Sequence, residues 1–258
     1  MSRWGGQPAK LLRKVCHVEA IRGPTSSAEW PRLPVYTLTF ATPPSMSNTV
    51  RIDCGDVVKI VVPNFKPKSY SMSAERPGEF DITFKLYPNG VCSGYLDGIK
   101  LGEEITVFKR GSKSRLPGTH VGLIAFGVGI TEALPIAAAE LAKPEAQHVR
   151  LLWASKAWGD LFWHDEITAL CVAHPGRFSV ETILSREERK GSLHGRCRSE
   201  VIAAVFDGAW GTAVGGPNER HRDGVRFLTV GTKPMMREAE AMLRQLGYEV
   251  PGKNMLLG

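Results

Sequence analysis

Residues 121–131 read Val121-Gly-Leu-Ile-Ala-Phe-Gly-Val-Gly-Ile-Thr131, and this stretch decides the fold of the second half of the chain. Its first six residues, Val121 to Phe126, form a continuous apolar run, which is typical of a strand buried on both faces of a parallel sheet. Two closely spaced glycines follow at once, and a helical pattern then extends from Glu132 to Leu141. A strand, a glycine turn and a helix in this order predict one unit of an α/β domain.

The residues that follow repeat this alternation of strand and helix. Further strands are expected at Val149–Ala154, Phe178–Leu184 and Val225–Val230. Further helices are expected at Gly159–Leu170 and Met235–Leu246. The glycine-rich segment Gly208–Gly224 is expected to be an exposed loop, and a catalytic role for His221 within it is the less favoured interpretation. We therefore predict a parallel sheet covered by helices over residues 117–258.

Residues 11–116 have a β pattern instead. Alternating or β-branched runs predict strands at Val35–Phe40, Val57–Val62 and Phe80–Tyr87, and Ser93–Asp97 is expected to form a short helix. Several short strands with this spacing predict a closed barrel or a sandwich. The basic residues 1–10 are expected to form an arm before it, and Gly111–Gly118 is expected to join the two domains.

The composition limits the range of partners. The chain has 258 residues, of which 43% are hydrophobic, and no run approaches the length needed to cross a bilayer. A formal net charge of +7 favours anionic partners. The basic run Lys109–Arg115 contains no aromatic residue on which bases could stack, so we expect no nucleic-acid binding. That run is expected to be a solvated loop or a docking edge for an acidic protein.

The five cysteines indicate a reducing compartment. Their number is odd, and no pair has the Cys-x-x-Cys spacing, so neither disulfides nor a metal site is expected. The N-terminal residues lack the apolar core of a secretory signal. An intracellular location follows as an expectation, with the cytoplasm and an organelle such as a plastid or mitochondrion left open.

Polar and aromatic residues in the β half form the first candidate site. Lys68-Ser-Tyr-Ser71 follows a proline-bounded segment, Phe84-Lys-Leu-Tyr87 comes next, and Gly90-Val-Cys-Ser93 opens the short helix. This order resembles the flavin domain of the ferredoxin–NADP reductase superfamily, and especially its NADH–cytochrome b5 reductase branch. The resemblance implies an antiparallel Greek-key β-barrel that binds FAD.

The resemblance also implies a role for each of these residues. Lys68 would bind the FAD pyrophosphate, Tyr70 would pack on the flavin, and Ser71 would place its hydroxyl near the reacting flavin nitrogen. Free N–H groups at the helix start would face the pyrophosphate. Lys68 stands where the family has arginine; it keeps the charge but loses the planar fork, so we expect weaker FAD binding. The remaining candidate flavin contacts are Ser69, Lys85, Tyr87, Gly90, Val91, Cys92 and Ser93.

The glycine turn resembles the Gly-Thr-Gly-Ile-Thr-Pro loop with which the same family receives its nicotinamide nucleotide. Gly127 and Gly129 would permit close backbone approach of the phosphates, and Thr131 is expected to cap the helix. Glu132 stands where the family has proline. Its charge suits a helix start but opposes a bound pyrophosphate.

A third segment, Val230-Gly-Thr-Lys-Pro-Met235, resembles the family's Cys-Gly-Pro-Pro-Pro-Met, which lies beside the nicotinamide and flavin rings. Gly231, Pro234 and Met235 match and are predicted cofactor contacts. Val230 replaces a cysteine close to the hydride-transfer centre, and Val230 and Ser71 are therefore the two candidate catalytic positions.

The choice of nucleotide is expected to depend on residues after the second strand of the α/β half. Ser155 and Lys156 lie where NADP-dependent members of the family bind the extra phosphate, and this slightly favours NADPH.

Together these resemblances predict an FAD-dependent oxidoreductase. NAD(P)H would give a hydride to the flavin, and electrons would pass to a separate haem or iron–sulfur protein, expected to be acidic. The alternative is a non-catalytic, reductase-like subunit of a larger assembly, with the retention of FAD left open. It is motivated by the three departures at Lys68, Glu132 and Val230. The oligomeric state is left open by the sequence.

Overall fold

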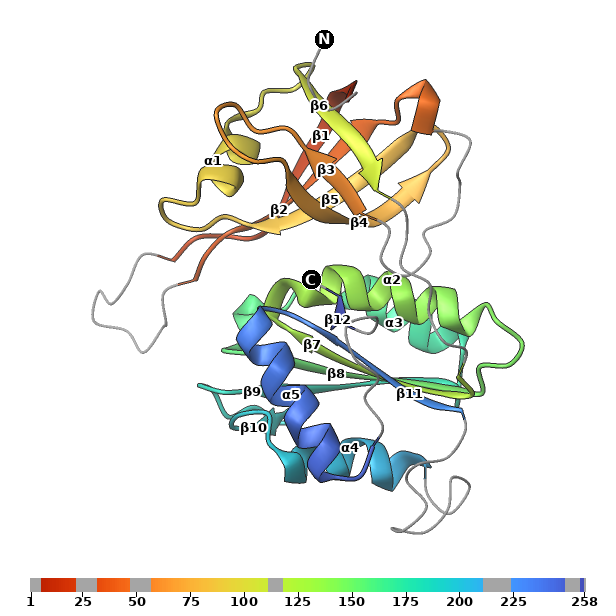
Figure 1. The fold of residues 1–258 in the computed structure, drawn as a ribbon. Helices are drawn as coiled ribbons and strands as arrows, with labels where there is room; N and C mark the ends of the chain where they lie inside the picture. The colour runs from red at the N-terminus through yellow and green to blue at the C-terminus, as the bar shows by residue number, and fades with distance from the viewer. Residues whose placement is uncertain are drawn as a thin grey trace. The chain divides into compact units, whose positions relative to one another are not determined.

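The computed structural model describes residues 6–21, 32–46, 57–110, 118–210, 224–248 and 256–257. The chain separates into two compact units, Met1–Lys113 and Ser114–Gly258. The ribbon drawing shows the helices and strands of each unit (Figure 1). Within the described residues, no helix is long and apolar enough to cross a membrane.

The first unit is a closed six-stranded barrel. Its strands are β1 (Gln7–Val18), β2 (Val35–Ala41), β3 (Val57–Ile60), β4 (Lys68–Arg76), β5 (Glu79–Lys85) and β6 (Glu104–Arg110). Their order around the barrel is β1-β2-β5-β4-β3-β6, and all neighbours for which pairs are described are antiparallel. Since β2 pairs with β5 and β3 pairs with β6, strands distant in sequence close the barrel. The predicted antiparallel barrel is therefore confirmed.

Alternating side chains fill the barrel because every second residue of a strand faces inward. Phe40 and Phe80, on paired strands, are buried with ring centroids 5.5 Å apart. Helix α1 (Val91–Gly98) packs onto this core through the buried Leu96. The short helix predicted at Ser93–Asp97 is therefore present, but it begins two residues earlier.

The predicted N-terminal arm is wrong in its second half. Gln7 to Lys10 belong to β1 and pair with β6, and Ala9 is buried. The small residue Ala9 is the only one of these four that is both apolar and buried, so hydropathy does not reveal the strand. The pairing arises because β6, almost a hundred residues later, needs a partner to close the barrel. Residues 1–5 of the predicted arm lie outside the described residues.

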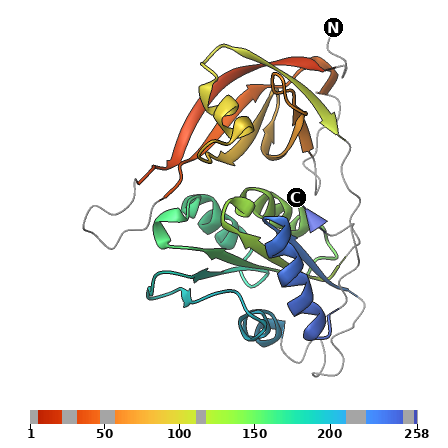
Figure 2. The same ribbon diagram turned by 60° about the vertical axis from the view of Figure 1, so that its left-hand side comes forward.

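The second unit is an α/β domain whose sheet has the order β10-β9-β8-β7-β11-β12, with all described pairs parallel. The strands are β7 (His120–Phe126), β8 (His148–Ser155), β9 (Phe178–Leu184), β10 (Leu193–His194), β11 (Val225–Val230) and β12 (Leu256–Leu257). The helices are α2 (Ile130–Leu141), α3 (His164–Ala173), α4 (Ser199–Trp210) and α5 (Lys233–Gln245). Helices α2 and α3 cover one face of the sheet, and α4 and α5 cover the other (Figure 2). The predicted parallel-sheet domain is confirmed.

Helix α4 corrects the predicted loop at Gly208–Gly224, whose first three residues belong to this helix. Ile202, Phe206 and Trp210 are buried at helical spacing and pack against Phe227 of β11 and its neighbours. This burial outweighs the poor helix propensity of Gly208. Residues 211–223, including His221, lie outside the described residues.

Helix α3 also differs from its prediction at Gly159–Leu170. Trp158–Asp160 form a short 3-10 turn, and α3 begins only at His164, after Trp163 with its left-handed φ of 61°.

Candidate functional site

The topology of the second unit predicts a ligand-binding crevice at one edge of its sheet. β8 and β9 extend from one side of β7, whereas β11 and β12 extend from the other side. Connections therefore diverge to opposite faces beyond the carboxyl ends of β7 and β11, and ligands of open α/β sheets bind at such a point. The predicted nucleotide segments Gly127–Thr131 and Val230–Met235 directly follow these two strand ends.

The two segments pack against each other through glycines. A Cβ on Gly129 would lie 2.6 Å from the carbonyl oxygen of Val230. A Cβ on Gly231 would lie 2.9 Å from Cβ of Phe126. Both distances are shorter than real Cβ contacts, so each turn accepts only glycine without a shift of its neighbour. Gly127 has space around it, but its φ of 53° favours glycine for conformational reasons.

Thr131 does not have the predicted capping role. The turn Gly127–Gly129 leads directly into α2, so the cap position falls on Gly129 and Thr131 is already helical. Its hydroxyl donates to the carbonyl oxygen of Val128 at 2.9 Å and thereby braces the turn from within. Glu132 lies in the first turn of α2 and is 9% exposed.

Val230 and Met235 differ in exposure. Val230 is buried, and its Cγ1 lies 3.2 Å from where a Cβ of Gly129 would be. Pro234 and Met235 are exposed in the first turn of α5, where proline costs no hydrogen bond. The valine therefore supports the glycine turn, whereas the methionine is accessible.

Ser155 and Lys156 lie at the carboxyl end of β8, beside a segment that the sequence analysis did not single out. Their carbonyl oxygens accept hydrogen bonds from the amides of Ser185 (3.0 Å) and Arg186 (2.9 Å). Nearby, the guanidinium of Arg189 lies 4.1 Å from the centre of the Trp158 ring. The available signal was the charged segment 186–190, which follows β9 and contains three basic residues and two glutamates.

A residue inside β8 was also missed. The indole N–H of the fully buried Trp153 donates to the carbonyl oxygen of Gly127 at 2.8 Å. The only sequence signal was a tryptophan within an apolar run, since a buried indole N–H usually finds an acceptor.

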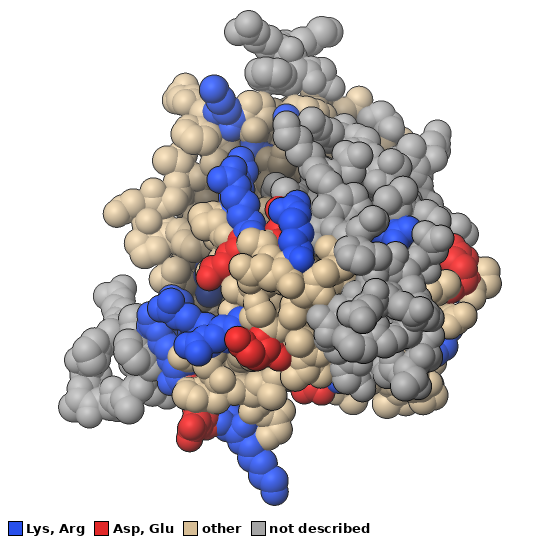
Figure 3. All heavy atoms as spheres, turned by 60° about the horizontal axis from the view of Figure 1, so that its bottom comes forward, with Lys and Arg blue, Asp and Glu red and all other residues tan. Residues whose placement is uncertain are grey.

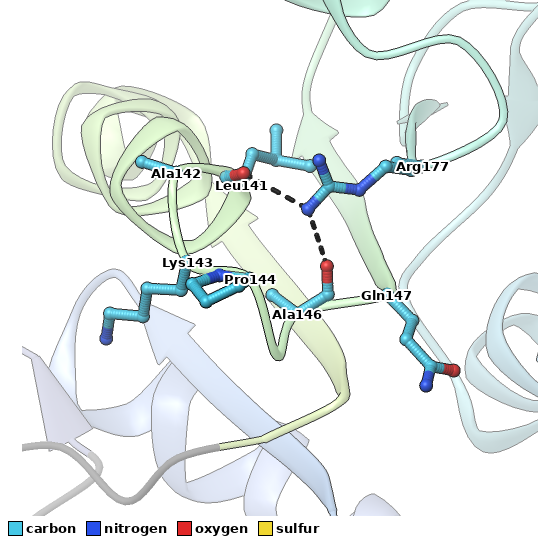
Figure 4. Close-up of a pocket in the computed structure, with 7 residues that line it drawn as sticks. All are labelled: Leu141, Ala142, Lys143, Pro144, Ala146, Gln147 and Arg177. Atoms are coloured by element: carbon cyan, nitrogen blue, oxygen red, sulfur yellow. Dashed lines mark hydrogen bonds between the residues drawn. The ribbon is translucent and has the colours of Figure 1, made fainter.

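The pocket of 410 Å³ shown in Figure 4 lies elsewhere, at the amino ends of the strands. There the Arg177 guanidinium donates to the carbonyl oxygens of Leu141 (3.1 Å) and Ala146 (2.6 Å). These bonds satisfy carbonyls at and just after the end of α2, so Arg177 has a structural role.

In the barrel, the structure brings the two predicted flavin segments together. Tyr70 of β4 and Cys92 of α1 both pack against the barrel core. Burial, with a smaller effect of Cys92, raises the pKa of Tyr70, so its hydroxyl stays protonated at neutral pH. Lys68 and Ser69 are exposed at the start of β4, and Ser71 is half-buried. Lys85 is half-buried at the end of β5, and Tyr87 is 47% exposed.

The start of α1 is arranged as an anion site. Ser93 accepts a hydrogen bond from the amide of Tyr87 (3.2 Å) and donates to the carbonyl of Gly90 (3.2 Å). A Cβ on Gly90 would collide with that hydroxyl and would lie 3.1 Å from the Tyr87 carbonyl oxygen. The amides of Val91 and Cys92 and that of Ser93 lie in the first turn and have no intrahelical acceptor. With no acidic residue in this turn, the helix start fits a pyrophosphate such as that of FAD.

Comparisons with known proteins found similarity in both halves of the chain. Residues 35–116 match the family model of the oxidoreductase FAD-binding domain, and residues 123–241 match that of the oxidoreductase NAD-binding domain. NADH-cytochrome b5 reductase 1 of Mycosarcoma maydis is 28% identical over 75% of this chain and 56% of its own length. The corresponding protein of Scheffersomyces stipitis is 32% identical over 74% of this chain and 63% of its own length. The chain thus spans less than two thirds of these relatives.

Solved structures share the fold at lower identity. The cytochrome b5 reductase domain of Ulva prolifera nitrate reductase is 19% identical, with a TM-score of 0.73 over 99% of this chain and 98% of that chain. A ferredoxin NADP+ reductase from Neisseria gonorrhoeae, solved with bound FAD and NADP, is 17% identical, with a TM-score of 0.70 over 97% of this chain and 96% of that chain.

Proposed function

We propose that the chain, which matches the oxidoreductase FAD-binding and NAD-binding domain families, is an FAD-dependent oxidoreductase that takes a hydride from NAD(P)H and passes electrons to a separate haem protein. The observation that carries the proposal is the junction of the two glycine turns. Gly129 packs closely against Val230, and Gly231 against Phe126, so the two turns meet where the sheet topology favours a ligand site.

In the barrel, the proposal assigns binding and orientation to four features. The first amides of α1 and the Lys68 ammonium group would hold the pyrophosphate. The neutral Tyr70 ring would pack on the flavin, and the Ser71 hydroxyl would hydrogen-bond near its reacting nitrogen. Bound FAD would supply the redox chemistry, because a flavin accepts a hydride and releases electrons singly. The protein's contribution is thus to position the rings and exclude competing reactions.

The preference for NADPH is a further part of the proposal. The relatives named above carry NADH in their names, which speaks against it. One observation favours NADPH: other cations lie near Lys156 at the carboxyl edge of the sheet. The amide of Arg186 donates a hydrogen bond to the Lys156 carbonyl oxygen, and the Arg189 guanidinium lies over the ring of the nearby Trp158. A ribose phosphate would meet these three cations there, together with the carboxylate of Glu187, which lies 4.0 Å from the Arg189 guanidinium. Comparing kcat/KM for NADPH and NADH, in the chain and in Lys156→Ala, tests this choice.

A haem protein is the proposed acceptor because the curated relatives are named for cytochrome b5. The net charge of +7 would steer an acidic acceptor toward the chain. Lys and Arg side chains are prominent on the face drawn in Figure 3, with Asp and Glu side chains between them.

The non-catalytic alternative is supported by one observation. Glu132 is buried in the first turn of α2, so a negative charge lies at the helix start to which the proposal assigns the phosphates. Under this alternative the chain still binds FAD through the barrel but does not use the nucleotide.

A spectrum and a titration separate these functions. We expect the purified protein to be yellow and to be bleached by NADPH or NADH without oxygen. The colour should return when ferricyanide or cytochrome b5 is added. A colourless protein would contradict the FAD site, and a yellow protein that neither nucleotide bleaches would establish the alternative.

A further inference from the structure

Trp153 occupies an unusual position for a residue that the reaction does not touch. It lies on β8, is the largest side chain with no exposed surface, and points its indole N–H at the nucleotide turn. The acceptor is the carbonyl oxygen of Gly127 at 2.8 Å. In the register of the sheet Trp153 lies opposite Ala125, so the indole reaches past the end of β7 to the first residue of the turn.

The indole is itself held in place. Phe162 meets the Trp153 ring edge-on, with centroids 5.8 Å apart and an interplanar angle of 90°. Phe162 is 4% exposed, so this contact lies in the interior. Close packing on a buried strand leaves the indole one orientation, and its N–H is therefore a fixed donor.

The bond controls a peptide plane that faces the crevice. The Gly127 carbonyl and the Val128 N–H belong to one planar trans peptide group, so they point in opposite directions. Drawing the carbonyl toward the buried indole turns the Val128 N–H away from the domain interior. Gly127 has a positive φ and no Cβ to restrict its backbone, so an anchor from outside the turn matters for the orientation of this plane.

The other bonds of the turn do not replace this anchor. The amide of Ile130 donates to the carbonyls of Gly127 and Val128, and Thr131 also donates to Val128. These bonds hold the turn to its own helix. The Trp153 bond is the one described side-chain hydrogen bond that joins the Gly127 carbonyl to a neighbouring strand.

We propose that Trp153 is a positioning residue for the dinucleotide: its indole N–H orients the Gly127–Val128 peptide so that the Val128 N–H faces the pyrophosphate. This inference rests on the proposed function, because it requires that the crevice binds NAD(P)H. It adds a determinant of nucleotide affinity in the sheet beneath the turn.

The chain offers a matched control. Trp210 is also a buried tryptophan of the second unit, 5% exposed, but its indole nitrogen has no hydrogen-bond partner among the described residues. Trp153→Phe and Trp210→Phe thus remove the same atoms from two interior sites, and only the first removes a bond to the nucleotide turn. Loss of packing alone would lower the stability of both variants.

The test measures the rate of anaerobic flavin bleaching against NADPH and NADH concentration. For Trp153→Phe we expect the half-saturating concentration to rise about threefold to tenfold, the range that one net hydrogen bond gives, with FAD content and limiting rate unchanged. Trp210→Phe should leave the half-saturating concentration at the level of the unaltered chain. Equal values for all three proteins would overturn the proposal.

A second variant protects the test against a folding defect. Replacing Trp153 by 3-benzothienylalanine keeps the bicyclic ring and removes only the N–H donor, and it should weaken nucleotide binding as Trp153→Phe does. Unchanged affinity in this variant would also overturn the proposal. If neither nucleotide bleaches the flavin of the unaltered chain, the proposed function itself fails, which is a different outcome from active proteins of equal affinity.

Discussion

The turn before α1 and the turn before α2 both lead into a helix and both need glycine, but they are held by contacts of very different range. In the barrel, Tyr87, Gly90 and Ser93 hold one another within seven residues. In the α/β unit, Gly129 rests on Val230, about a hundred residues away. A phosphate-binding turn can therefore be held by contacts within one short segment or by contacts between distant strands. Substitutions in the two turns should therefore weaken ligand binding to different extents.

The largest effect is expected at the long-range turn. Gly129 has a φ of −59°, which any residue can adopt, so Gly129→Ala causes no backbone strain of its own. Its one effect is to place a Cβ 2.6 Å from the carbonyl oxygen of Val230. Backbone cannot move aside cheaply, and overpacking of this kind costs about 1–3 kcal/mol. We expect nucleotide affinity in the bleaching titration to fall about tenfold or more, while FAD stays bound.

Gly94→Ala is the control for that substitution. Gly94 lies inside α1 with nothing within 4 Å of its added Cβ. We expect a stability gain of about 0.5–1 kcal/mol in thermal unfolding and no change in either affinity. If Gly129→Ala behaves like Gly94→Ala, the long-range contact does not hold the turn.

A smaller effect is expected at the turn before α1. Gly90→Ala brings a Cβ against the Ser93 hydroxyl, which is the end of a side chain and can rotate. We expect FAD binding, measured by fluorescence on reconstitution, to weaken by about 1 kcal/mol.

The added cost of Gly90→Ala should shrink when Ser93→Ala is already present, because the colliding oxygen is then gone. An equal cost with and without the Ser93 hydroxyl would show that its collision with the added Cβ is not the cause.

The smallest effect concerns charge. Glu132→Gln keeps the size of the side chain in the first turn of α2 and removes its negative charge. If the carboxylate opposes the pyrophosphate, nucleotide affinity should rise about twofold to fivefold, as expected for a partly screened charge near a helix start. Equal or weaker binding would show that Glu132 does not oppose the nucleotide.

The contrast in range also explains which predictions could be made from the sequence. The short helix after Gly90 and the strand–turn–helix at 121–141 follow from neighbouring residues, and the structure contains both. The cap predicted at Thr131 was wrong because the 3-10 turn Gly127–Gly129 leads directly into α2, which therefore begins before Thr131. The conformation of this turn depends on its packing against Val230 of β11. The last three residues of helix α4 were assigned to a loop because Gly208 begins a glycine-rich segment, whereas in the structure the buried Phe206 and Trp210 pack in the core beside the sheet.

By itself, the sequence determined the alternation of elements, the two-domain division and the positions of the glycine turns, because periodicity and turn chemistry act between near neighbours. Only the tertiary structure decided that Gln7–Lys10 close the barrel, that Gly129 lies on Val230, and that Trp153 reaches Gly127. These contacts join residues between 26 and about 100 positions apart. Such contacts depend on how the strands align and on which side chains fill the space between them. The sequence pattern around any one of these residues does not specify its distant partner.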